Sequence, residues 1–158
     1  MNSLVVQELF DALSDELLAV QDFVELLQQE QRLLMENETE QLLNLAERKS
    51  ARALKLNELG EIRRNLLRKQ LRELSRETIH SWLKINSPEG LALWHKIITL
   101  AEQSQEINTI NGELIQMKLR HIQQTLTALG GAVRQASLYG PDGQPDFSPG
   151  GGRSLGNG

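Results

Sequence analysis

The sequence predicts an all-α protein: a long antiparallel helical hairpin or coiled-coil-like bundle of about three long helices. Leu occurs 29 times in 158 residues, against 14 occurrences of Val plus Ile, and aromatic residues make up only 4%. This balance favours helices over sheets. Nine of the 12 Gly and three of the four Pro lie at or beyond Gly130. We therefore expect one helical domain over residues 1–137 and a flexible Gly/Pro-rich C-terminal tail over residues 138–158.

The first helix is expected over residues 3–35. Its apolar residues recur at steps of three and four from Val6 to Leu34, which places them on one helical face. At about 1.5 Å per residue this helix is about 50 Å long. In the polar break that follows, we expect Asn37 to cap the next helix, with Glu40 as its reciprocal acceptor.

The second helix is expected over residues 38–74. A short helical stretch over residues 75–85 either continues it or forms a separate turn of helix. Ser87 and Pro88 then predict a restart, since Ser is a preferred N-cap and Pro suits the first helical position. The third helix is expected over residues 88–136.

Charge is divided between these helices. Residues 1–35 hold seven acidic residues and one basic residue, whereas residues 36–85 hold eight acidic and 11 basic residues. We expect the acidic first helix to pack antiparallel on the basic second helix, with complementary flanks that select the register. The second helix carries a basic cluster, for which we prefer an ion-paired, solvated face to a phosphate-binding stripe: Arg63, Arg64, Arg68, Lys69, Arg72 and Arg76.

Catalytic and metal-binding patterns are nearly absent. The chain has no Cys and no phosphate-loop, dinucleotide-binding or nucleophile-elbow motif. Glu77 and His80 form one E-x-x-H element, but a di-iron bundle needs a second copy and further buried Glu. We therefore expect a surface histidine, no enzymatic activity, no metal and no cofactor. Trp82 and Trp94 flank the restart at Ser87, and we expect both to pack the helix corner.

The C-terminal part of the third helix carries a second apolar stripe, from Ile115 to Val133, at steps of four and three. A helix of about 75 Å is too long for two 50 Å helices to cover. Part of the stripe therefore closes a dimer or receives an amphipathic partner helix. A kink in the third helix that folds the stripe onto its own domain stays open, with Gly130 and Gly131 as the weak point.

One segment carries a resemblance to a known family. Residues 108–115, Asn-Thr-Ile-Asn-Gly-Glu-Leu-Ile, are similar to the Asn-x-x-Asn-Gly-x-Leu-Ile segment of FlgN-type flagellar export chaperones. Residues 124–131 and 138–143, the acidic first helix and the basic second helix follow in the order and spacing of that family. The chain thus resembles a chaperone of hook-associated (hook–filament junction) proteins.

The resemblance implies a cytoplasmic, non-enzymatic chaperone without a cofactor, which inserts into no membrane and binds no nucleic acid. Its implied partners are the C-terminal segments of the junction proteins, the cytoplasmic domain of the export gate and components of the export ATPase complex. Tyr139 matches the tyrosine that docks on the gate. The residues expected to bind the client are Leu114, Ile115, Leu119, Ile122, Leu126, Leu129 and Val133.

Two alternatives belong to other functional classes. In the first, the apolar stripe makes a self-associating structural coiled-coil protein. In the second, the basic second helix binds an anionic surface or a nucleic acid, which salt-sensitive binding would reveal. The sequence leaves the oligomeric state and the preferred junction protein open.

Overall fold

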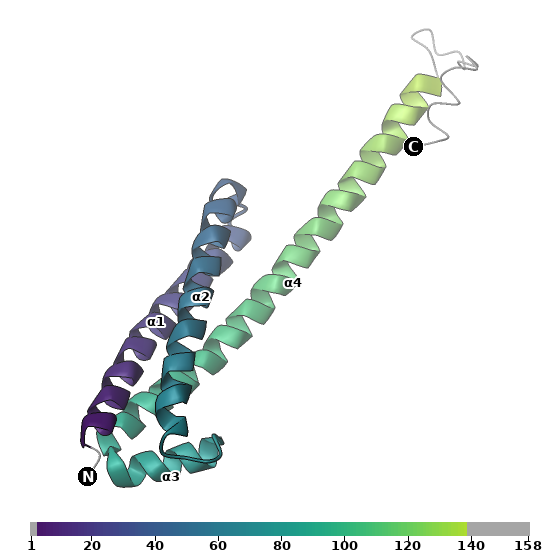
Figure 1. Ribbon diagram of the computed structural model, residues 1–158. Helices are drawn as coiled ribbons and strands as arrows, with labels where there is room; N and C mark the ends of the chain where they lie inside the picture. Colours follow the sequence, from purple (N-terminus) through teal and green to yellow (C-terminus); the bar gives the residue numbers. More distant parts are fainter. Residues whose placement is uncertain (1–2, 139–158) are drawn as a thin grey trace. The chain divides into compact units, whose positions relative to one another are not determined.

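The computed structural model describes residues 3–138, and all regular structure in that range is helical (Figure 1). The all-α prediction is therefore confirmed, whereas nearly all of the predicted tail lies outside the described residues. The chain divides into two compact units, residues 1–114 and residues 115–158; the single domain expected over residues 1–137 stays a prediction. The elements are α1 (Ser3–Met35), the 3₁₀ helix η1 (Thr39–Gln41), α2 (Leu42–Arg68), α3 (Arg76–Asn86) and α4 (Pro88–Leu138).

The end of α1 differs from the prediction. Asn37 has a φ of 58°, in the left-handed region that asparagine tolerates better than most residues. Its N–H donates to Leu34 O at 3.4 Å, and Glu38 N–H donates to Leu33 O at 2.9 Å. This is the Schellman pattern that closes a helix C-terminus. The expectation that Asn37 caps the second helix with Glu40 is wrong, because its left-handed backbone ends the first one.

The second helix ends at Arg68, and its predicted continuation to residue 74 is wrong. Ser75 has extended backbone angles, its hydroxyl accepts from Thr78 N–H at 3.1 Å, and Thr78 Oγ1 accepts from Ser75 N–H at 3.0 Å. This capping box begins a new helix, so a helix cannot run through residue 75. The stretch expected over residues 75–85 is therefore the separate helix α3.

Ser87 alone separates α3 from α4. Its hydroxyl accepts from Gly90 N–H at 3.1 Å, and Pro88 is the first residue of α4. Both features of the predicted restart are confirmed. A Cβ atom on residue 90 would lie 2.7 Å from Ser87 Oγ, so the cap and the close approach require Gly90.

The main core of unit 1 draws on all four of its helices. The α1 stripe meets Leu67 of α2, Ile79 and Leu83 of α3, and Trp94 of α4. Trp82 packs against this core from its edge, so both tryptophans pack the corner as predicted. A smaller cluster of Leu26, Leu33 and Leu45 lies between α1 and α2. The packed interior of the described structure is therefore in unit 1.

Candidate partner-binding site

A buried carboxylate joins three helices in the first of two polar layers in unit 1. Glu16 of α1 is only 3% exposed. Its two carboxylate oxygens accept from Arg63 Nε of α2 at 2.9 and 3.0 Å. The Arg63 guanidinium lies 4.8 Å from the ring centroid of Trp94 in α4, within range of a cation–π interaction. The buried charge is thus paired, as burial of a carboxylate requires.

The second polar layer centres on Glu30, which is 6% exposed. Lys49 of α2 donates to Glu30 Oε1 at 3.1 Å and to Asn108 Oδ1 at 2.6 Å. Asn111 of α4 donates to Glu30 Oε1 at 2.8 Å and to Leu27 O at 2.9 Å. This layer therefore ties α1, α2 and α4 together a second time.

The two layers fix the directions of the helices. Moving 14 residues forward along α1, from Glu16 to Glu30, moves 14 residues back along α2, from Arg63 to Lys49. The same step moves forward along α4, from Trp94 to Asn108. α1 and α2 are thus antiparallel, with the acidic and basic helices paired as the charge pattern predicts, and within unit 1 α4 runs parallel to α1 (Figure 1).

Glu16 and Glu30 were missed as buried residues in the sequence analysis. Each nevertheless lies at helical spacing within the apolar stripe: Glu16 between Leu13 and Val20, and Glu30 between Leu27 and Leu34. A charge at such a position is a detectable signal, because a buried carboxylate needs a partner from another helix.

The basic cluster of α2 is largely occupied by ion pairs. Arg63 pairs with Glu16, Arg64 and Arg68 approach Glu61, and Arg76 pairs with Glu102. These contacts agree with the ion-paired face that the sequence analysis preferred to a phosphate-binding stripe.

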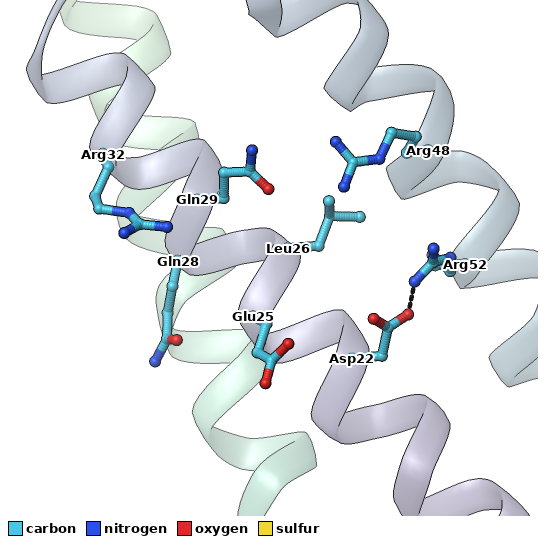
Figure 2. Close-up of a pocket in the computed structure, with 8 residues that line it drawn as sticks. All are labelled: Asp22, Glu25, Leu26, Gln28, Gln29, Arg32, Arg48 and Arg52. Carbon is cyan, nitrogen blue, oxygen red and sulfur yellow. Dashed lines mark ion pairs between the residues drawn. The ribbon is translucent and has the colours of Figure 1, made fainter.

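A groove between α1 and α2 carries charges of both signs (Figure 2). Arg52 of α2 makes an ion pair with Asp22 of α1 across it. The lining contains no His, Ser or Cys, and hence neither an imidazole base nor a hydroxyl or thiol nucleophile. It consists of Asp22, Glu25, Leu26, Gln28, Gln29, Arg32, Arg48 and Arg52. The groove therefore offers polar contacts rather than a catalytic constellation.

His80 does not belong to a multi-ligand metal centre in the described structure. Its Nδ1 lies 3.1 Å from Nε2 of His95, and the ring centroids are 5.2 Å apart. Within residues 3–138, no three His, Asp or Glu side chains converge as metal ligands would. The E-x-x-H element of Glu77 and His80 thus has no matching partner there, in line with the expected surface histidine.

The predicted client-binding residues lie almost entirely in unit 2. Leu114 closes unit 1 and is half-buried. The other six side chains recur at steps of four and three along α4, which puts them on one helical face. All six are exposed, from 39% for Ile115 to 61% for Leu126: Ile115, Leu119, Ile122, Leu126, Leu129 and Val133. We call these six residues the exposed stripe; a row of large exposed apolar side chains is typical of an interaction surface.

The comparison with protein-family models gives one match. The FlgN protein family model matches residues 1–146, which is most of the chain. The chain belongs to the FlgN family. This is the flagellar export chaperone family, whose members bind flagellar hook-associated proteins and are not known as enzymes. The resemblance noted in the sequence is therefore confirmed, and the protein is assigned to flagellum biogenesis and export.

Membership of the FlgN family extends through both units and beyond the described residues. Tyr139, expected to dock on the export gate, lies within the matched range but outside the described residues. No described helix has the length and hydropathy needed to cross a membrane. Comparisons with curated proteins and with solved structures give no match.

Proposed function

We propose that this FlgN-family protein is a cytoplasmic chaperone that binds the C-terminal helical segments of hook-associated, hook–filament junction proteins. It prevents their premature assembly and delivers them to the export gate. The client-binding residues are Leu114 and the exposed stripe. Tyr139 docks on the cytoplasmic domain of the gate, and components of the export ATPase complex are further partners.

The exposure of the stripe is the observation that carries this proposal. Six large apolar side chains on one helical face are at least 39% exposed, which leaves their apolar area available to a partner. An amphipathic client helix can lay its own apolar face along such a row. Burial of about 800 Å² per partner is typical of a stable complex, and it would shield the client face that drives assembly.

The client and gate sites are separate in this proposal. The stripe ends at Val133, six residues before Tyr139. The Tyr139→Ala variant should therefore keep full client affinity and lose binding to the gate domain. An equal loss of both activities would contradict separate sites.

Isothermal titration of the full chain with the C-terminal segments of both junction proteins tests the proposal. We expect sub-micromolar binding to at least one segment. The Leu126→Ala/Leu129→Ala variant should weaken that binding by at least tenfold, because both residues lie in the stripe. Its far-ultraviolet circular dichroism should stay close to that of the parent chain, since these side chains are 61% and 60% exposed.

The matched control is Leu18→Ala/Leu54→Ala, in which two similarly exposed leucines of unit 1 (65% and 61%) are truncated. This variant should bind the client with parental affinity. Equal losses in both variants would contradict the stripe as the site. If neither segment binds and sedimentation shows a stable oligomer, the self-associating alternative replaces the chaperone proposal.

A further inference from the structure

Asn111 is the only polar residue of α4 that is almost wholly buried in the described structure. It is 1% exposed, and no residue from 112 to 135 is buried. It lies at helical spacing between Ile107 and Leu114, which continue the apolar row of α4 on both sides. A polar side chain at such a position lowers stability unless a specific partner compensates for its burial.

The compensation at Asn111 is specific but incomplete. Its Nδ2 donates to both Glu30 Oε1 and Leu27 O, whereas its Oδ1 is buried and has no hydrogen-bond partner within residues 3–138. An apolar side chain of similar size would leave no such acceptor. The residue therefore carries a cost in stability that the packing of unit 1 alone does not require.

The apolar row explains what the amide can provide in return. Because Ile107 and Leu114 are both apolar, packing of α4 shifted by about one turn would place either of them near Leu27 at little cost. The shift would also place Asn111 against apolar residues of α1, near Val24 or Leu34, and take its donor away from Glu30. A buried Asn that fixes register in this way is well attested in coiled coils.

We propose that Asn111 is a positioning residue that sets the axial register of α4 against α1. Asn108 supports it from one turn earlier through Lys49, which also binds Glu30. The register determines where burial of α4 ends, and hence that Ile115 is the first residue of the exposed stripe. This gives a physical role to the two asparagines of the Asn-x-x-Asn-Gly segment.

Spin labels on introduced cysteines test the proposal in the full chain, which has no native Cys. Gln21→Cys in α1 and Glu106→Cys in α4 replace exposed side chains of unit 1. By the 14-residue correspondence of the two layers, Glu106 lies about two turns beyond the level of Gln21, so an axial slip changes the distance between the labels. With Asn111 in place we expect one narrow distance distribution.

In the same labelled chain, Asn111→Leu should give a second distance population, displaced by up to about 5 Å, the rise of one helical turn. The matched control is Thr109→Leu, which adds the same side chain at an exposed position of the same helix and should keep the single population. A role in packing alone would shift the melting temperature without adding a population.

Asn111→Ala covers the case in which leucine prevents folding. A second population in either variant that folds supports the proposal. One unchanged narrow population in every variant that folds overturns it, and so does failure of both variants to fold, because Asn111 would then be required for folding itself. The readout needs no client, so its failure is distinguishable from failure of the chaperone proposal.

Discussion

The two units use the same residue type for opposite purposes. Leu27 of α1, in unit 1, is 0% exposed, whereas Leu126 of α4, in unit 2, is 61% exposed. Both belong to apolar rows with the same helical spacing. Regular apolar spacing therefore identifies a face that can be buried, but the neighbouring helices decide whether the chain itself buries it.

The units also differ in their charged residues. Unit 1 holds two buried carboxylates, each paired with a cation from another helix. The sequence of unit 2 has no acidic residue from Ile115 to Leu138. Buried ion pairs are arranged by tertiary structure in the first unit, whereas the described part of the second offers an apolar face with few charges around it. The predictions below test this contrast.

The largest effect is expected for Arg63→Ala. This change leaves Glu16 buried without its ion-pair partner and removes the cation from Trp94. Breaking one side of a buried ion pair costs about 3–5 kcal/mol. Urea denaturation followed by circular dichroism measures the loss. Arg64→Ala is the control, since its ion pair with Glu61 is partly exposed and should be worth about 1 kcal/mol or less; equal losses would show that Glu16 does not depend on Arg63.

The next largest effect separates the two leucines of the opening comparison. Leu27→Ala should lower the free energy of unfolding by about 3 kcal/mol, through lost apolar burial and the cavity left behind. Leu126→Ala should change it by less than about 0.5 kcal/mol, since exposed positions carry little packing energy. The same denaturation experiment measures both variants. A large loss for Leu126→Ala would mean that the stripe is part of a core.

A smaller effect is expected at the start of α3. Ser75→Ala removes the hydroxyl that accepts from Thr78 N–H, and loss of an N-cap costs about 1 kcal/mol. Thermal melting of unit 1 should detect it. Ser50→Ala is the control in the exposed interior of α2, where alanine is the better helix former. A neutral Ser75→Ala would show that the capping box does not hold α3 in place.

The smallest effect should have the opposite sign. A Cβ atom at Gly131 meets no other atom within 4 Å, so Gly131→Ala should strengthen the helix around it by about 0.5–1 kcal/mol. Amide hydrogen exchange over residues 126–135 measures the gain as slower exchange. Gly90→Ala should instead destabilise unit 1, because its Cβ would lie 2.7 Å from Ser87 Oγ. Faster exchange in Gly131→Ala would contradict an open helical position.

Local chemistry accounts for much of what the sequence predicted correctly. The bounds of α1, the restart at Ser87 and the antiparallel pairing of an acidic and a basic helix follow from spacing, capping and charge. The errors also have local causes. Asn37 is suited to both helix ends, and only its left-handed backbone shows that it closes α1. The end of α2 was misplaced because the capping role of Ser75 was missed.

By itself, the sequence determined the helical class, the apolar faces and the family resemblance, because helical spacing and caps act over a few residues. Tertiary structure alone decided which charges are buried: Glu16 and Glu30 have carboxylates like those on the surface until Arg63, Lys49 and Asn111 approach from other helices. It also decided that the stripe from Ile115 to Val133 is exposed. Burial depends on what packs opposite a residue, and that partner lies far away in the sequence.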